Sequence, residues 1–422
     1  MRSNLLRVAA VLLLLSLAAV AFVLWQRSQP LTNIADQPFL FEQRARELNI
    51  PSQRPAVAAT VAGGLYLLSA NTTEQTSTLT LRMSHDGGEH WMQPTTLNSP
   101  GSSVTTSAEN APQLAARGMY AFALWQEKNE TGGPQLRVAR SSGMNAKPPS
   151  STQVIDKSSA DTSYSGFASL SLAPNGDIYV AWLDGRDQTS AATGTFNVYI
   201  ARSTDGGLSF HHNVRVATLA CPCCRPSVAI GSDGKVYVAY RHVFRDNERD
   251  IAVAVSTDSA EHFSAPVRVS SDRWKLYGCP ESGPVIALQG DSLVVAWYTA
   301  ASDRPGIRAA VSTDNGSTFS HPVIISREIQ SANHPYLAES NDGKLAIAFS
   351  GRTIASSGDW GDIRPFVVRI DSRGRVSAPV GVPSNTPGAR YPVLSLAPDG
   401  DTYVTWSSPD APKVYLARAV SR

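Results

Sequence analysis

The sequence predicts an all-β fold built as a β-propeller, a ring of four-stranded blades. The first observation is a unit that recurs along the chain and opens each time with a proline or a small residue: Pro55, Pro112, Ala168, Pro226, Pro284, Pro335 and Pro392. These residues are separated by 57, 56, 58, 58, 51 and 57 positions. A period of this length favours a radial array of sheets over a sandwich. Seven blades are expected, or six if one repeat is split.

The second observation is the composition of the strands and turns within each unit. In the fourth unit two runs rich in β-branched and aromatic residues, 227–230 and 236–240, flank Asp233-Gly234, and a third run follows at 251–255. Such a pattern predicts a hairpin followed by a further strand. Equivalent second strands are expected at 65–69, 120–125, 178–182, 293–297, 345–349 and 402–406, and similar turns at Asn175-Gly176, Asp342-Gly343 and Asp399-Gly400.

A third observation is an octet, Ser-x-Asp-x-Gly-x-x-aromatic, between the third and fourth strands. It occurs at 84–91, 203–210 and 312–319, and the copy at 256–263 has Ala260 in place of glycine. The aspartate can accept backbone N–H bonds, the glycine permits a left-handed backbone, and the aromatic side chain can fill the space beneath the sheet. The octet therefore predicts a self-bonded turn.

This octet resembles the Asp-box, also called the BNR repeat, and over roughly residues 52 to 422 the chain resembles the sialidase-like β-propeller superfamily. The resemblance implies the propeller fold. It also implies that the Asp-boxes lie on the face away from the usual active site, so they indicate little about chemistry.

The N-terminus has the pattern of a membrane segment. Arg2 and Arg7 precede an uncharged stretch from Val8 to Trp25, which is just long enough to span a bilayer. We expect a signal anchor at 1–25 that contacts the membrane and holds the propeller outside the cytoplasm; cleavage after Ala21 would instead release it as a periplasmic or secreted protein. A tether follows at 26–50, ending in a short helix or an edge strand, and the propeller covers 51–422.

Composition excludes one class of partner. The chain has 37 lysine and arginine residues against 35 aspartate and glutamate residues, a net charge of +2, and the basic residues are scattered. Without a basic stripe, nucleic acid is not expected. A glycan, another small molecule, a metal or a protein remains as the expected partner.

Candidate site residues lie where each first strand opens and each second strand ends, because in a propeller these positions meet around the central channel. At the openings this filter selects Arg54, Cys221, Cys223, Cys224, Arg225, Cys279, Glu281, His334, Arg390 and Tyr391. After the second strands it selects Asp184, among others. Trp125, Trp182, Trp297 and Trp406 close second strands and would either line a sugar pocket or pack between blades.

The resemblance implies specific roles for some of these residues. Sialidases hold the sugar carboxylate with three arginines, use a tyrosine activated by a glutamate as nucleophile, and use an aspartate as acid/base. Arg54 with Pro55 is similar to the family's Arg-Ile-Pro signature, without the isoleucine, and Arg225 and Arg390 occupy matching places in later units. Tyr391 with Glu281, and Asp184 or Asp187, would fill the remaining roles. The first unit, where the family keeps its acid/base aspartate, has only Glu74.

The cysteines occupy two places, Cys221-Pro-Cys223-Cys224 and Cys279-Pro280, and Cys221 and Cys279 are one repeat length apart. One interpretation is disulfides, including one between neighbouring blades. The other is a redox or soft-metal site, in which the four thiols and His334 bind copper(I) with Glu281 and His242 as outer partners.

Three functions follow from these alternatives. The first is non-hydrolytic binding of a ligand or a copper-type metal at the channel mouth, which is rich in cysteine and arginine. The second is an exo-acting glycosidase of the sialidase class. The third is a structural scaffold for a partner protein.

Overall fold

The computed structural model describes residues 39–422, except for 62, 74–76, 108, 129–132, 143–149, 157–162, 188–193, 302–304, 341–342, 355–359, 371–374, 385–387, 410 and 421–422. Within this part the regular structure is almost all β, and the helical element is one 3₁₀ turn, Arg245–Asn247. The prediction of an all-β fold is confirmed.

The strands follow the repeat. Blade one contains β3 (Ala56–Ala59), β4 (Leu65–Thr72), β5 (Ser77–Ser84) and β6 (Thr95–Thr96). Blade two contains β7 (Ser103–Val104), β8 (Gln113–Arg117), β9 (Tyr120–Lys128), β10 (Pro134–Ser141) and β11 (Ser151–Gln153). Blade three contains β12 (Ser165–Leu172), β13 (Ile178–Asp184), β14 (Phe196–Ser203) and β15 (Val214–Ala220). Blade four contains β16 (Ser227–Ile230), β17 (Val236–Val243), β18 (Arg249–Ser256) and β19 (Val267–Arg268).

The remaining blades have the same order of strands. Blade five contains β20 (Val285–Gln289), β21 (Ser292–Thr299), β22 (Gly306–Ser312) and β23 (Val323–Ile324). Blade six contains β24 (Gln330–Glu339), β25 (Leu345–Arg352), β26 (Arg364–Ile370) and β27 (Val380–Gly381). Blade seven contains β28 (Arg390–Leu396), β29 (Thr402–Ser408) and β30 (Ala411–Val420), together with β1 (Leu40–Phe41) and β2 (Arg46–Pro51) from the other end of the described chain.

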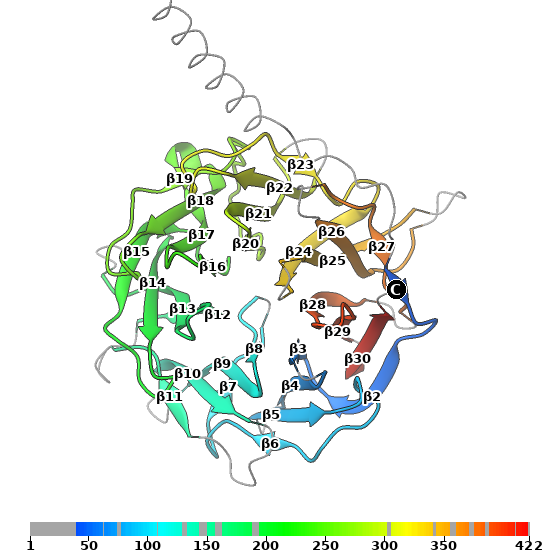
Figure 1. Cartoon of the computed structure of the whole chain (residues 1–422). Coiled ribbons are helices and arrows are strands. Elements are labelled where there is room, and N and C mark those ends of the chain that lie inside the picture. The colour runs from blue at the N-terminus through cyan, green and yellow to red at the C-terminus, as the bar shows by residue number, and fades with distance from the viewer. Residues whose placement is uncertain are drawn as a thin grey trace, which may run out of the picture.

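The blades follow one another around a ring, and the strands nearest the centre are β3, β8, β12, β16, β20, β24 and β28 (Figure 1). By hydrogen bonding, the described strands form six sheets, one of them with eight strands. That sheet consists of blades three and four, which are joined by the single pair Ala220 and His242. Counting its two halves separately gives seven blades, the number that the repeats predict.

The first and last blades are joined by the chain ends. Strand β2 pairs antiparallel with β30 and supplies the outer strand of blade seven (Figure 1). Val57 and Leu65 of blade one share a buried apolar cluster with Ala397, Tyr403 and Leu416 of blade seven. The segment for which a short helix or an edge strand was expected is thus an edge strand, and it covers the edge that β30 would otherwise expose.

The structure contradicts the predicted membrane anchoring. Among the described residues no helix is long and apolar enough to cross a membrane, because the chain from Phe39 onward forms strands. The proposed anchor at 1–25 and the tether up to residue 38 lie outside the described residues. The location predicted from that anchor is therefore withdrawn.

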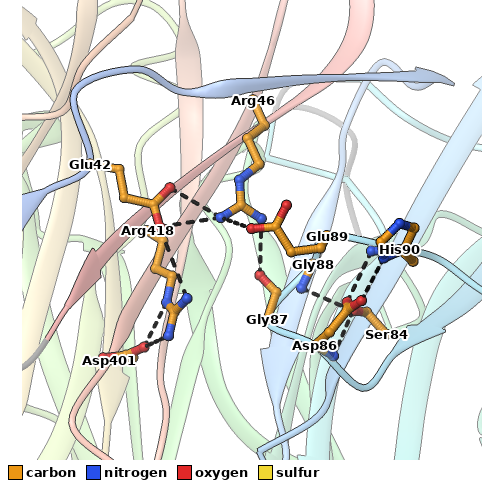
Figure 2. Close-up of polar contacts among 10 residues, drawn as sticks. All are labelled: Glu42, Arg46, Ser84, Asp86, Gly87, Gly88, Glu89, His90, Asp401 and Arg418. Atoms are coloured by element: carbon orange, nitrogen blue, oxygen red, sulfur yellow. Dashed lines mark hydrogen bonds and ion pairs between the residues drawn. The ribbon is translucent and has the colours of Figure 1, made fainter.

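The Asp-boxes form the predicted turns. In the first of them, the Ser84 hydroxyl donates to Asp86 at 2.8 Å, and Gly88 N and His90 N donate to Ser84 Oγ and Asp86 Oδ1 at 2.9 Å each (Figure 2). These bonds hold the pKa of the Asp86 carboxyl well below its usual range; the hydrogen bond from His90 N is the largest cause. The Asp-boxes of blades three, four and five repeat the bond between serine and aspartate, at 2.7 to 2.9 Å.

The strand register places the Asp-boxes away from the strand openings. Ser84 pairs with Leu65 at the start of β4, whereas the first strand opens near the end of β4. The first Asp-box also fixes β2, because Arg46 forms an ion pair of 2.8 Å with Glu89 and donates to the Gly87 carbonyl at 3.3 Å (Figure 2). The site is therefore to be sought at the opposite end of the blades.

The four tryptophans that close second strands are packed inside the protein. Trp125, Trp182, Trp297 and Trp406 are each at most 1% exposed and belong to the buried clusters between blades. Three of them donate through Nε1 to a carboxylate, which satisfies their polar atom. They serve packing, and a sugar pocket lined by them is not found among the described residues.

We expect Gly88→Ala to lower the free energy of unfolding by about 1–3 kcal/mol more than Gly234→Ala. Both glycines have positive φ, 88° and 81°, so both substitutions strain the backbone. A Cβ at Gly88 would lie 2.7 Å from the Leu416 side chain in β30, whereas a Cβ at Gly234 would meet nothing within 4 Å. Denaturant titration of the two variants measures the difference, and equal losses would contradict the tight packing between blades one and seven.

Candidate functional site

The strand openings bring charged side chains from several blades around one small cavity. A cavity of about 50 Å³ is lined by residues from blades one, two, four, six and seven, which include Arg54, Glu109, Arg225, His334, Tyr336 and Tyr391. A larger cavity of about 230 Å³ shares Glu109, Gln113, Arg225, Pro335 and Tyr336 with it, so the two are adjacent. The small cavity is the candidate site.

Register shifts in β24 and β28 position two of these residues, His334 and Tyr391. The register of β24 shifts between Asn333 and Tyr336, and that of β28 shifts between Arg390 and Val393. Within these shifts His334 and Tyr391 adopt positive φ, 54° and 53°. A bulge re-aims the side chains around it, and here it lies immediately before the proline that opens the strand.

Two of the predicted arginines, Arg225 and Arg390, act electrostatically on the third, Arg54. Burial lowers the pKa of Arg54, and the charges of Arg225 and Arg390 lower it further, while Tyr391 and Glu281 oppose this. Like charges are costly to gather unless an anion compensates them. Arg54 therefore lies within electrostatic reach of Arg225, Arg390, Tyr391 and Glu281.

Glu109 joins three blades at the centre of the site and is not among the residues predicted from the sequence. Its Oε2 accepts hydrogen bonds from Arg225 N at 3.1 Å and from Gly283 N at 2.7 Å. Its backbone carbonyl accepts from Arg225 Nε at 2.8 Å and also from Nη2, which fixes the guanidinium group. Glu109 precedes Pro112 by three residues, as Glu281 precedes Pro284. The same positional filter could have found it.

Burial raises the pKa of the Glu109 carboxyl to about 7, against the opposing effect of Arg225 and the two backbone bonds. The side chain is 6% exposed. A carboxyl with such a pKa is partly protonated at neutral pH, so its negative charge only partly offsets the three arginines.

His334 and Tyr391 form the aromatic side of the site. Their rings lie 3.9 Å apart, and the Arg54 guanidinium carbon lies 4.2 Å from the centre of the Tyr391 ring. Burial, followed by Arg54, Arg390 and Arg225, lowers the pKa of His334 to about 3, so this ring is neutral at physiological pH. Burial raises the pKa of Tyr391. Tyr336, a second residue that the filter missed, lines both cavities one residue after Pro335.

Asp184, predicted as acid/base, is held elsewhere. It is fully buried at the end of β13, where it accepts hydrogen bonds from Ser165 Oγ at 3.0 Å and Trp182 Nε1 at 2.6 Å and pairs with Arg186 at 3.0 Å. It lines neither cavity, because its bonds tie it to its own blade. Glu74 lies outside the described residues.

The structure does not assemble the predicted copper site. Cys223 and Cys279 form a disulfide between blades four and five, so two of the expected thiolate ligands are bonded to each other. His334 packs against Tyr391 in the arginine cluster. Cys221 and Cys224 are free and buried, and with Cys223 their sulfur atoms lie within 4.8 Å of one another. Of the two interpretations, the inter-blade disulfide is the one present.

The pKa values of the two free cysteines are shifted in opposite directions. A hydrogen bond from Cys224 is the main cause that lowers the pKa of the Cys221 thiol to about 6, and Arg241 and Arg249 lower it further. Burial raises the pKa of the Cys224 thiol, and Cys221 raises it further. Cys221 is therefore the thiolate of the pair, and Cys224 carries the proton.

We expect the stability of the protein to depend on the pH through Glu109. Burial raises the pKa of this carboxyl from 4.5 to about 7, so its ionised form is less favourable in the folded chain than in the unfolded chain. The free energy of unfolding should therefore fall by up to about 3 kcal/mol as the pH rises from below 4.5 to above 7. Glu109→Gln should remove this component.

Denaturant titrations at several pH values measure this dependence. Glu47→Gln, at an exposed position of β2, is the control variant, because it also removes one carboxylate. An unchanged pH dependence in Glu109→Gln would contradict the assignment.

Comparisons with known proteins give only distant likenesses. No protein-family model matches the chain, and no curated protein matches it. Among solved structures, a protein of unknown function from Dyadobacter fermentans DSM 18053 is 14% identical and covers 91% of this chain and 99% of its own, with a TM-score of 0.47. The Hadza microbial sialidase Hz136 is 14% identical over 82% of this chain and 74% of its own, with a TM-score of 0.49.

An α-L-arabinofuranosidase from Fusarium graminearum is 12% identical over 90% of this chain and 97% of its own, with a TM-score of 0.46. The structural neighbours thus include sialidases and related glycoside hydrolases. Likenesses at these identities and TM-scores do not show what chemistry this chain performs.

Proposed function

We propose that the cavity at the strand openings binds a ligand that bears a carboxylate, such as an acidic sugar, through Arg54 and Arg225, which line it, and through the nearby exposed Arg390. The observation that carries this proposal is that Arg54 and Arg225 line one small cavity, where burial lowers the pKa of Arg54 and the charges of Arg225 and Arg390 repel it and lower it further. A bound carboxylate would relieve this repulsion, and the planar guanidinium group can bind it through two parallel hydrogen bonds.

The fixed position of Arg225 supports the proposal. Two of its nitrogen atoms donate to the Glu109 carbonyl, so the guanidinium is oriented before any ligand arrives. A group held in advance loses little conformational entropy on binding. Arg390 is exposed, so it is the first of the three arginines that an incoming ligand would meet.

The size of the cavity supports a small anionic group at its base. At about 50 Å³ it suits a carboxylate rather than a whole sugar ring, since one buried water needs at least about 10–15 Å³. The Tyr391 ring, partly exposed beside Arg54, gives the rest of the ligand an aromatic face to pack on.

A sialidase-type hydrolysis is the second candidate function, and Glu109 favours it. A carboxyl group with a pKa of about 7 suits general acid/base catalysis, and Glu109 lines the same cavity as Tyr391, the expected nucleophile. Two observations weigh against it. Glu109 Oε2 accepts two backbone bonds, and burial raises the pKa of Tyr391, which opposes its ionisation. Binding without hydrolysis is therefore the main proposal.

We expect N-acetylneuraminic acid to bind the purified protein, and its methyl ester, which lacks the negative charge, to bind about 10- to 100-fold more weakly. Arg390→Ala should weaken binding of the acid by a similar factor, because it removes one positive charge from the site. Since Arg390 is exposed, the substitution leaves no buried cavity and should not unfold the protein. Arg44→Ala, also exposed but on the N-terminal segment, removes the same charge and should leave binding unchanged. Isothermal titration calorimetry measures all four cases.

Equal affinity for the acid and its ester, or equal losses in the two arginine variants, would contradict the proposal. Incubation with a fluorogenic sialoside separates the two candidate functions. If fluorophore is released by the wild type but not by Tyr391→Phe, while both bind the acid, the protein is a hydrolase; if neither releases it, the site binds without hydrolysis.

A further inference from the structure

Four sulfur atoms lie together at the openings of blades four and five, in a group that the carboxylate proposal does not use. Cys223 and Cys279 are bonded to each other. The Cys221 sulfur is 3.9 Å from the Cys223 sulfur and 3.7 Å from the Cys224 sulfur. Cys221 is thus placed between a disulfide and a thiol, close to both.

The four cysteines differ in their access to solvent. Cys221, Cys223 and Cys224 are 0%, 5% and 1% exposed, whereas Cys279 is exposed on the segment before Pro280, where Tyr277 is 89% exposed. The disulfide therefore has one buried sulfur and one at the surface. A partner molecule could reach the group only through Cys279.

Arg249 connects the buried thiol to the exposed segment. Its Nη1 donates to the Cys221 sulfur at 3.3 Å and to the Gly278 carbonyl, next to Cys279, at 2.9 Å. Arg241, which is 1% exposed, adds a second positive charge and donates to the carbonyls of Arg249, Ser282 and Tyr298. Positive charges beside a thiol favour the thiolate, which is the form that attacks disulfides.

We propose that the four cysteines form a thiol–disulfide exchange site, in which the buried pair Cys221 and Cys224 reduces a disulfide of a partner molecule through the exposed Cys279. A purely structural link between the blades needs only Cys223 and Cys279. Of the two further thiols, Cys221 lies 3.9 Å from the Cys223 sulfur and supplies a nucleophile, and Cys224, which lies 3.7 Å from Cys221, supplies a resolving group. This activity is separate from carboxylate binding.

The exchange within the chain takes two steps. The Cys221 thiolate attacks the Cys223 sulfur, so the bond between Cys221 and Cys223 forms and Cys279 leaves as a thiolate. Cys224 then loses its proton and attacks Cys221, so the bond between Cys221 and Cys224 forms and Cys223 leaves as a thiolate. No electrons are gained or lost by the chain in these steps.

The exchange with the partner disulfide, R–S–S–R, also takes two steps. The Cys279 thiolate attacks one partner sulfur and expels R–S⁻, which leaves a mixed disulfide. The Cys223 thiolate attacks Cys279, expels the second R–S⁻ and restores the bond between Cys223 and Cys279. In sum, two electrons pass from Cys221 and Cys224 to the partner, and the two R–S⁻ groups become two R–SH by taking up the proton of Cys224 and one proton from solvent.

Bis(2-hydroxyethyl) disulfide, a small neutral disulfide, tests the proposal on the full chain. We expect the wild type to release two 2-mercaptoethanol molecules per chain, and peptide mapping to find bonds between Cys221 and Cys224 and between Cys223 and Cys279. Cys221→Ser, which lacks the nucleophile, and Cys279→Ser, which lacks the exposed sulfur, should each release thiol at least about tenfold more slowly.

A second measurement needs only the wild type, in case a variant does not fold. Iodoacetamide added to the native protein should label Cys279, because internal exchange frees its thiol, and should leave Cys221 in a disulfide. No thiol release and no label on Cys279 would overturn the proposal. So would a Cys279→Ser variant as fast as the wild type, or a soft metal bound to the purified chain in equal amount.

Discussion

The pairing of β2 with β30 is the constraint on which the rest of the arrangement depends. It joins the beginning of the described chain to its end, and Ser52 N and Gln53 N bond to Pro412 and Ala70 just beyond it. Arg54 follows directly. Because blade seven is completed at this point, Arg54 of the first blade lies where the charges of Arg390 and Arg225 act on it. The candidate site is thus a consequence of ring closure.

At the centre, one buried carboxyl group holds the openings of three blades. Glu109 belongs to blade two, and it bonds to Arg225 before blade four and Gly283 before blade five. A buried charge is tolerated when hydrogen bonds and opposite charges compensate it. The same group fixes the orientation of Arg225 and sets how much positive charge the cavity presents. The contacts between blades and the proposed carboxylate binding therefore depend on one side chain.

The disulfide lies close in sequence to two residues of the candidate site, Arg225 and Glu281. Cys223 is two residues before Arg225, and Cys279 is two residues before Glu281. The segment between Cys279 and Gly283 is further held by Arg241, which donates to the Ser282 carbonyl at 2.9 Å, and by the Glu109 bond to Gly283. The thiol group and the arginine cluster thus share a short stretch of backbone, although their chemistry is different.

Features that depend on local patterning could be predicted from the amino-acid sequence. Strands, hairpin turns and Asp-boxes could be predicted because alternating apolar residues, Asp-Gly pairs and the serine–aspartate bond act over a few positions. The repeat also placed Arg54, Arg225 and Arg390 at equivalent strand openings, and so predicted that they meet. The period carries this information because equivalent positions in a ring face the same axis.

The contacts between neighbouring blades could not be predicted from the sequence and follow from the folded arrangement. Glu109 and Glu281 stand three residues before their prolines, yet one is buried and bonded to two blades while the other is exposed. Likewise Cys223, rather than Cys221 or Cys224, is bonded to Cys279, and Asp184 is turned inward to Trp182. Burial and partner choice at these positions depend on contacts between segments far apart in the chain, which no local pattern specifies.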